Sequence, residues 1–196
     1  ANWNDGRIST IEGLEIYEGI DDVAFIFTII DTVGKSYRID KKAVFFQGTS
    51  NGAFMSQRIA AEHADRVAGI AAFIGSMSRH HFNSFNPDRP VPILFINGTE
   101  DKAVPYGGGT TAAGDIVPVE KVMKKWVVRN DCRRRPRIDH LPDINKKDHS
   151  RIKRHIFSGC RNNAEIQLLK VIGGGHTTPG DWESKITEVL MGKTNQ

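Results

Sequence analysis

Residues 43–52 join an apolar run to the pattern Gly-x-Ser-x-Gly and read Ala43-Val44-Phe45-Phe46-Gln47-Gly48-Thr49-Ser50-Asn51-Gly52. The short apolar run over 43–46 predicts a buried strand. The residues after it predict a helix that packs on a sheet through Met55, Ile59 and Ala60. The stretch therefore predicts a strand, a tight turn and a helix in succession.

Ser50 lies at the predicted turn between this strand and this helix. A serine on so sharp a turn presents its hydroxyl at the top of a sheet, an arrangement called a nucleophile elbow. We expect Gly48 and Gly52 to leave room for the crowded backbone there. The alternative is an ordinary turn in which Ser50 only caps the helix. A base and an acid later in the chain, in a suitable order, would distinguish the two interpretations.

The chain has 196 residues and a mass of 21.8 kDa, which predicts one domain over 1–196 with a buried core. Its 39% hydrophobic and 26% charged residues are typical of a soluble protein. No apolar run approaches the length that spans a bilayer, and we expect no membrane partner. The first residue is Ala1 and not Met, so either a leader has been removed or the chain begins inside a longer protein.

Basic residues in one part of the chain account for much of the net charge of +4 and the pI near 9.1. They are Arg133, Arg134, Arg135, Arg137, Lys146, Lys147, Arg151, Lys153 and Arg154. Asp139, Asp143 and Asp148 interrupt them, and no aromatic residue, zinc spacing or helix-turn-helix spacing accompanies them. We therefore expect a solvated basic hairpin at about 133–159 and no nucleic-acid partner.

Apolar runs and helical patterns alternate along the rest of the chain. Runs over 67–74, 92–97 and 166–172 predict strands, and residues 182–191 predict a closing helix. A helix from Pro118 has a buried face formed by Val119, Val122, Met123, Trp126 and Val127. Strands separated by helices predict an α/β fold with a mostly parallel sheet and helices on both faces.

Three other segments have weaker patterns. An apolar helix over 23–30, capped by Asp21 and ended by Gly34, is expected to be buried nearly all round. Residues 80–92 are polar and contain proline, which predicts a loop. Residues 1–18 show no sustained period, so we expect a surface loop there as well.

Three polar residues, Ser50, Asp101 and His176, each follow a different predicted strand. Sites in parallel sheets form at the carboxyl ends of the strands. A serine needs an imidazole to take its proton, and the imidazole works best when a carboxylate fixes its tautomer. The chain order Ser, Asp, His is that of α/β-hydrolases, so we predict this fold with these residues as nucleophile, acid and base.

Two of these residues have competitors in the sequence. Glu100 is an alternative acid, and Asp101 could simply form the turn after Gly98 and Thr99. We favour Asp101 because the shorter carboxylate is the more common third member. His176 lies in a glycine-rich turn after a late strand, which favours it as the base. The other histidines are His63, His80, His81, His140, His149 and His155.

The backbone N–H of Asn51 is one predicted oxyanion donor, because Asn51 follows the nucleophile. The second donor normally comes from a His-Gly-type loop after an early strand, and no such loop precedes Ser50 in this chain. With that donor absent, we expect slow turnover. This chemistry needs no metal or organic cofactor, and none is predicted.

Six blocks of sequence can be followed from one end of the chain to the other. They are Trp3-Asn4-Asp5-Gly6-Arg7, Asp21-Asp22-Val23-Ala24-Phe25-Ile26, Gly48-Thr49-Ser50-Asn51-Gly52, Asn97-Gly98-Thr99-Glu100-Asp101 with Val104-Pro105-Tyr106, Ser158-Gly159-Cys160, and Gly174-Gly175-His176-Thr177 with Pro179-Gly180. Together and in this order they resemble the polyhydroxybutyrate depolymerase and feruloyl esterase family of α/β-hydrolases, the carbohydrate esterase type 1 group.

The resemblance implies a secreted or periplasmic serine carboxylesterase. Its expected substrates are hydroxybutyrate oligomers of polyhydroxyalkanoates, or feruloyl and acetyl esters of plant polysaccharide. By matched motif, Ser50 is the nucleophile, Asp101 the acid and His176 the base. From the residues alone, Cys132 and Cys160 are either two thiols or a pair, whereas the resemblance implies that they form a disulfide.

The chain also departs from the family pattern. Ala53 stands where the family has Gly, Asn97 where it has His, and Thr178 where it has Trp. The loss of that Trp beside the base predicts a wider or differently lined pocket. Three aromatic residues near the expected rim are candidates for either the core or a substrate platform: Phe54, Phe82 and Tyr106.

Family members carry further strands and the His-Gly loop before the block at residue 3. We therefore expect 1–196 to be the C-terminal two-thirds of a hydrolase, with the elbow strand left as a bare apolar edge. An alternative function is a catalytically inactive binding protein that holds an acidic or carbohydrate partner on the basic hairpin. A peptidase on the same fold is a third.

Overall fold

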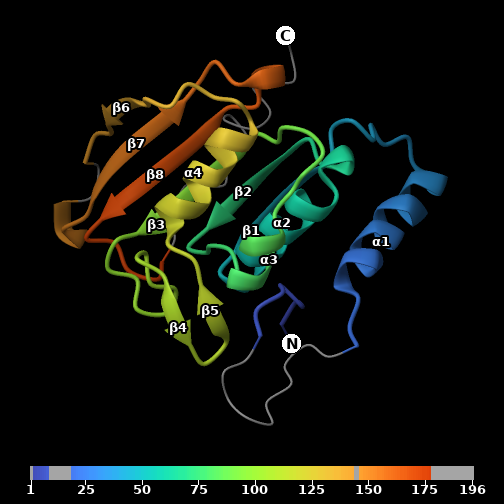
Figure 1. Ribbon diagram of the computed structural model, residues 1–196, viewed down its shortest axis with the longest axis horizontal. Helices are drawn as coiled ribbons and strands as arrows, with labels where there is room; N and C mark the ends of the chain where they lie inside the picture. Colours follow the sequence, from blue (N-terminus) through green and yellow to red (C-terminus); the bar gives the residue numbers. More distant parts are fainter. Residues whose placement is uncertain (1, 9–18, 144–145, 178–196) are drawn as a thin grey trace.

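The computed structural model describes residues 2–8, 19–143 and 146–177. Its main sheet has six strands in the order β1-β2-β3-β8-β7-β6, and β4 pairs with β5 in a separate hairpin (Figure 1). The strands are β1 Phe45–Thr49, β2 Gly69–Phe73, β3 Ile93–Gly98, β4 Gly109–Thr111, β5 Gly114–Ile116, β6 Arg137–His140, β7 Arg151–Phe157 and β8 Ile166–Ile172.

Four α-helices and three short 3-10 helices are described. They are α1 Asp22–Ser36, α2 Asn51–Glu62, α3 Arg79–Ser84, α4 Val119–Arg129, η1 Ala64–Arg66, η2 Lys146–Asp148 and η3 Arg161–Asn163. Strands β1, β2, β3 and β8 are parallel to one another, whereas β7 and β6 are antiparallel. The mostly parallel sheet with helices is the predicted α/β architecture.

The sheet has a different apolar cluster on each face. On one face, alternate side chains of β2, β3 and β8 meet the buried faces of α2 and α4 in the larger cluster. The predicted α4 face is confirmed, because Trp126 is fully buried and its indole N–H donates to Gln57 at 2.8 Å. The other face carries a smaller cluster that includes Phe73, Ile96 and Leu169. The helix predicted over 182–191 lies outside the described residues.

The strand before the elbow is real but less buried than predicted. It begins at Phe45 and continues to Thr49, and its side chains are half-buried or exposed. Among the described strands β1 pairs only with β2, which makes it an edge of the sheet, as expected from the sequence. An edge strand has a neighbour on one side only, and this position explains the exposure.

Helix α1 corrects the prediction of a helix buried nearly all round. Asp21 caps it, as predicted, by accepting a hydrogen bond from the Ala24 backbone N–H at 2.9 Å. Only Val23 and Phe27 are buried, since one face of the helix packs towards Phe46 and α2. The remaining surface of the helix is exposed and includes the apolar residues Phe25, Ile29 and Val33. The helix also continues through Gly34, which was predicted to end it.

Residues 80–92 are not all loop, because α3 forms over Arg79–Ser84. The Ser78 hydroxyl caps this helix by accepting from the His81 backbone N–H at 3.1 Å. Phe82 packs against the larger cluster. The cap and the packing of Phe82 and Phe85 against the larger cluster thus stabilise a short helix in a segment whose polar composition predicted a loop.

The basic segment forms the predicted hairpin, and β6 and β7 extend the main sheet at the edge opposite β1 (Figure 1). Its charges are partly compensated on the hairpin itself. Arg154 and Arg137 both contact the carboxylate of Asp139, and Arg151 contacts Asp143. The interruptions noted in the sequence therefore act as local ion-pair partners.

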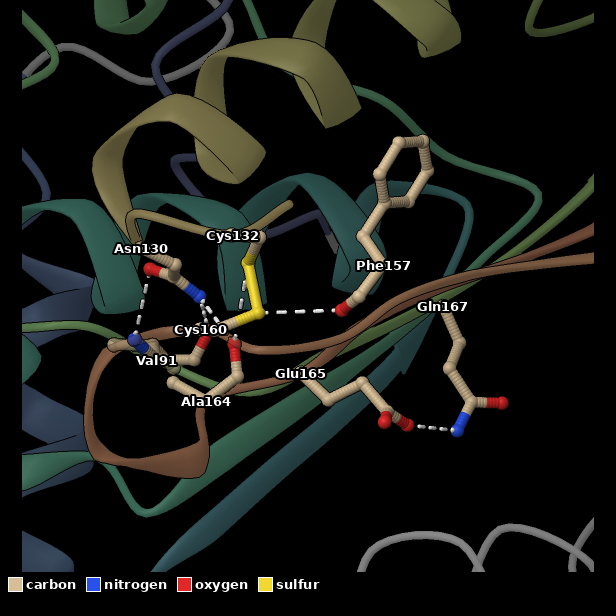
Figure 2. The surroundings of a disulfide bond; sticks show 8 residues. All are labelled: Val91, Asn130, Cys132, Phe157, Cys160, Ala164, Glu165 and Gln167. Atoms are coloured by element: carbon tan, nitrogen blue, oxygen red, sulfur yellow. Dashed lines mark hydrogen bonds between the residues drawn. A yellow bond between two sulfur atoms is a disulfide. The ribbon is translucent and has the colours of Figure 1, made fainter. Parts of the chain in front are cut away.

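A disulfide joins Cys132 and Cys160, as the resemblance implied (Figure 2). Beside it, the buried Asn130 side chain donates to the Val91 carbonyl at 2.7 Å and the Ala164 carbonyl at 2.8 Å. The disulfide and this amide together fix the end of α4 to the start of β8. Closing a loop with a sequence separation of 28 stabilises the fold by about 3.5 kcal/mol in the chain-entropy model.

Candidate active site

Ser50 lies between β1 and α2 with φ 53° and ψ −115°, a backbone conformation that a non-glycine residue rarely adopts. Its backbone N–H donates to the Phe73 carbonyl at 2.9 Å, which ties the turn to the end of β2. The Ser50 side chain makes no capping hydrogen bond to α2. The geometry is that of a nucleophile elbow, and the capping interpretation is wrong.

The two glycines of the elbow differ in what they permit. A Cβ on Gly48 would lie 2.1 Å from the Gly52 carbonyl oxygen, so only glycine fits there. A Cβ on Gly52 would meet nothing within 4 Å, which corrects the expectation that both glycines are needed. A Cβ on a third glycine, Gly75, would lie 2.4 Å from the Ala53 Cβ and 3.0 Å from the Ser50 carbonyl oxygen. The close approach on the far side of the elbow is therefore made by Gly75.

These contacts predict opposite outcomes for two alanine substitutions. Gly48→Ala is expected to displace the elbow and to lower the ester hydrolysis predicted from the sequence by about 10²-fold or more, because the clash is with backbone. Gly52→Ala is expected to keep turnover and to raise the free energy of unfolding by up to about 1 kcal/mol, since glycine is costly inside a helix. Urea unfolding and p-nitrophenyl acetate hydrolysis measure both. An equal loss of turnover in the two variants would contradict this description of the elbow.

Asp101 follows β3 on a tight turn, and its carboxylate is almost completely buried, with 1% of the side chain exposed. Its Oδ1 accepts from the backbone N–H groups of Ala103 at 2.9 Å and Val104 at 2.8 Å. Its Oδ2 lies 2.7 Å from Nδ1 of His176. Both carboxylate oxygens thus have partners, and the carboxylate is fixed in one orientation.

The turn with Asp101 and the turn with His176 are joined by two hydrogen bonds. The Glu100 N–H donates to the Gly174 carbonyl at 2.9 Å, and the Gly173 N–H donates to the Thr99 hydroxyl at 2.9 Å. A Cβ on Gly98 would lie 2.2 Å from the Gly174 carbonyl oxygen, so the close approach requires glycine. Gly98, at the end of β3, therefore allows the turn with the acid and the turn with the imidazole to meet.

His176 connects the other two residues. Its Nε2 lies 3.1 Å from Oγ of Ser50, on the opposite side of the ring from Asp101. An ionised carboxylate can only accept, so Nδ1–H donates to Asp101 and Nε2 is free to accept from the Ser50 hydroxyl. The structure thus brings together the three residues predicted from the sequence in an unbroken hydrogen-bonded chain.

The competitors of these residues lie elsewhere. Glu100 is exposed. Of the other histidines, His63 ends α2, His80 and His81 belong to α3, and His140 and His155 belong to β6 and β7. His149 lies just after η2. The predicted oxyanion residue Asn51 is the first residue of α2, so its backbone N–H has no acceptor inside the helix.

A polar cluster anchors the loop that follows Asp101. The Tyr106 hydroxyl donates to Glu120 at 3.1 Å, and the Lys170 ammonium donates to the same oxygen at 2.9 Å. The hydrogen bond from Lys170 lowers the pKa of Glu120, whereas burial and then the nearby Glu120 charge raise the pKa of Tyr106. At neutral pH Glu120 is thus ionised and Tyr106 protonated, and the loop is held to α4 and β8.

The three aromatic candidates for a substrate platform pack against other side chains, but they are buried to different extents. Phe54 is 1% exposed, and Phe82 and Tyr106 pack against the larger apolar cluster. Lys125 lies over the Phe82 ring at 4.2 Å, and Lys170 over the Tyr106 ring at 4.9 Å. Core packing is therefore the correct interpretation for Phe54, whereas for Phe82 and Tyr106, which are partly buried, both interpretations remain predictions.

The sequence did not predict that residues 2–8 contribute to this site. Asp5 is completely buried and its carboxylate accepts from the Asn51 side-chain amide at 2.6 Å. Asn51 also exchanges hydrogen bonds with the backbone of Trp3. The available signal was the Trp3–Arg7 block, whose acidic and basic residues stand two positions apart, but it does not specify a contact with residue 51.

The fold and these contacts define an α/β-hydrolase with a serine, histidine and aspartate at the carboxyl ends of its strands. Comparison with known families agrees, because a model of the phospholipase/carboxylesterase family matches residues 13–128. The chain therefore belongs to that family. Among the described residues, no helix is long and apolar enough to cross a membrane.

Individual relatives are similar at modest identity. Feruloyl esterase B of Piromyces equi is 26% identical over 181 residues, which cover 89% of this chain and 31% of the relative. The putative esterase NocK of Nocardia uniformis subsp. tsuyamanensis is 29% identical over 170 residues, which cover 81% of this chain and 49% of the relative. The chain thus spans less than half the length of these two proteins.

Solved structures show the same fold. The acetyl xylan esterase from Aspergillus awamori superimposes with a TM-score of 0.59 at 16% identity, over 87% of this chain and 67% of that chain. At this identity the likeness supports the fold alone. The α/β-hydrolase prediction is confirmed, whereas the comparisons give no specific support to a polyhydroxybutyrate depolymerase.

Proposed function

We propose that this protein is a serine-dependent carboxylic ester hydrolase. The observation that carries the proposal is the chain of hydrogen bonds from Asp101 Oδ2 to His176 Nδ1, 2.7 Å, and from His176 Nε2 to Ser50 Oγ, 3.1 Å. These are the contacts that an activated serine requires. Membership of the phospholipase/carboxylesterase family supports ester hydrolysis as the class of reaction.

In the first half of the reaction, Ser50 Oγ attacks the ester carbonyl carbon while His176 Nε2 takes the hydroxyl proton. The carbonyl oxygen becomes an oxyanion, and Asp101 stabilises the imidazolium through Nδ1–H. Collapse of this intermediate breaks the bond to the alcohol oxygen, which receives the proton from Nε2. The acyl group remains on Ser50.

In the second half, water attacks the acyl group and gives a proton to His176 Nε2. The new intermediate releases the carboxylic acid, and the proton returns to Ser50 Oγ. The Asn51 backbone N–H is the proposed oxyanion donor in both halves. That the chain lacks the second donor stays a prediction, and so does the slow turnover expected from it.

We favour feruloyl or acetyl esters of plant polysaccharide as the substrate class. Relatives named feruloyl esterase B and bifunctional acetylxylan esterase/xylanase XynS20E support this choice. The alternative substrates, hydroxybutyrate oligomers, are supported by the sequence resemblance alone. The Cys132–Cys160 disulfide supports an oxidising compartment, and hence a secreted or periplasmic protein.

The experiment compares three substrates: methyl ferulate, acetylated xylan and hydroxybutyrate oligomers. We expect release of ferulate or acetate to exceed release of hydroxybutyrate, and Ser50→Ala to abolish all three. Preference for hydroxybutyrate would overturn the substrate class. Hydrolysis that survives in Ser50→Ala would overturn the proposed function itself.

A further inference from the structure

Residues 2–8 lie against the start of α2, where they surround a buried ion pair. The Asp5 carboxylate accepts from Nε of Arg7 at 2.9 Å and from its Nη2 at 2.6 Å. Asp5 is completely buried, and 9% of the Arg7 side chain is exposed. The guanidinium also lies over the Phe54 ring of α2, 4.2 Å from its centroid. A buried pair with this geometry has one arrangement and holds both partners in it.

The same carboxylate holds the side chain of the residue after the proposed nucleophile. The Asn51 amide donates to Asp5 Oδ2 at 2.6 Å and to the Trp3 carbonyl at 3.0 Å. Its own oxygen accepts from the Trp3 backbone N–H at 2.7 Å. Both ends of the amide are therefore fixed, which restricts the Asn51 backbone as well. Its neighbour Ser50, at φ 53°, needs such support to stay in a strained conformation.

Arg7 also has an electrostatic role. The Asn51 side chain contacts the Asp5 carboxylate, so this carboxylate lies only one asparagine side chain away from the Asn51 backbone N–H. Without a counter-ion, this negative charge would oppose the negative oxyanion that forms there, and burial would strengthen the repulsion. The contact of Arg7 with both carboxylate oxygens, Nε to Oδ1 and Nη2 to Oδ2, neutralises this charge. The pair thus orients Asn51 without opposing the charge of the transition state.

We propose that Asp5 and Arg7 are positioning residues that hold the Asn51 backbone N–H as oxyanion donor and keep its surroundings electrically neutral. This inference rests on the proposed function. A purely structural role for the segment is the alternative, because Arg58 also ties it down by donating to the Asn4 carbonyl at 2.6 Å. Arg58 is therefore the matched control, since its hydrogen bond anchors the segment through Asn4.

The test measures kcat and KM for p-nitrophenyl acetate, the rate of fluorophosphonate labelling, and the urea midpoint. Arg7→Met is expected to lower kcat and the labelling rate by about 10- to 100-fold with KM changed less than about threefold. Arg7→Lys keeps the charge but loses the two-donor contact and the stacking on Phe54, and its kcat is expected to fall between those of Arg7→Met and the parent. The double variant Asp5→Asn/Arg7→Met removes the unpaired charge and is expected to be faster than Arg7→Met. Arg58→Met is expected to lower the urea midpoint and leave kcat unchanged.

Asn51→Ala gives an independent test, because it leaves the buried ion pair of Asp5 and Arg7 intact. It keeps the backbone N–H and removes only the side-chain clamp, and we expect kcat to fall by about 10-fold or more. Unchanged kcat in Arg7→Met and Asn51→Ala, with fluorophosphonate labelling of the parent at Ser50, would overturn the inference. So would a double variant no faster than Arg7→Met. A parent that is not labelled at Ser50 would instead refute the proposed function.

Discussion

Replacing Ser50 with alanine is expected to reduce ester hydrolysis by roughly 10⁴- to 10⁶-fold. The reason is that the acyl group has no acceptor once Oγ is gone, while His176 and Asp101 have nothing to activate. The fold should be unaffected, because the Ser50 side chain does not cap α2 and alanine removes only the hydroxyl. Initial rates with p-nitrophenyl acetate, corrected for hydrolysis in buffer, measure the loss.

The matched control for this prediction is Ser84→Ala. Ser84 is an exposed serine at the end of α3, where its hydroxyl donates to the His80 carbonyl. This variant is expected to retain the parent rate. A Ser50→Ala protein that keeps more than a few per cent of the parent rate would show that another residue is the nucleophile.

Asp101→Asn is expected to lower kcat by roughly 10⁴-fold through a change of tautomer. In the parent, Oδ1 accepts from two backbone N–H groups and Oδ2 faces Nδ1 of His176. The asparagine oxygen will take the Oδ1 position, because those N–H groups need an acceptor. Its NH₂ group then donates to Nδ1, which moves the imidazole proton to Nε2. His176 can no longer accept the proton of Ser50.

The control for the acid is Glu100→Gln, which alters the neighbouring carboxylate that competes with Asp101 in the sequence. Glu100 is exposed, so this variant is expected to stay within about twofold of the parent, as is usual for a surface substitution. If Glu100→Gln loses activity and Asp101→Asn does not, the assignment of the acid is wrong. Circular dichroism of both variants checks that the fold is intact.

The elbow and the strand ends were predictable because their chemistry is local. A short apolar run, a Gly-x-Ser-x-Gly turn and a helix with one apolar face specify their own conformations, and parallel strands bring their carboxyl ends to one rim. For this reason the sequence alone predicts that Ser50, Asp101 and His176 meet, although Ser50 and His176 are 126 residues apart. The family resemblance added the pairing of Cys132 with Cys160.

Other features depend on packing, which local patterns do not specify. An apolar composition predicted a buried α1, yet how much of a helix is covered depends on what lies next to it, and only Val23 and Phe27 are buried. Gly52 looked as necessary as Gly48, but only the distance to the opposing backbone distinguishes them. The 2–8 segment shows no apolar periodicity in its sequence. Hydrogen bonds to α2 hold it in place, including the contact between Asp5 and Asn51, and such contacts leave no periodic pattern.

The most direct test of the proposed mechanism is to treat the 196-residue chain with a fluorophosphonate and map the adduct by mass spectrometry. The reagent forms a bond between phosphorus and the oxygen of an activated serine, with loss of fluoride, and so reports on the hydrogen-bonded chain without any assumption about the ester. The mechanism predicts one adduct, on Ser50, that is lost in His176→Ala. An unlabelled but folded protein, or an adduct on another serine, would contradict it.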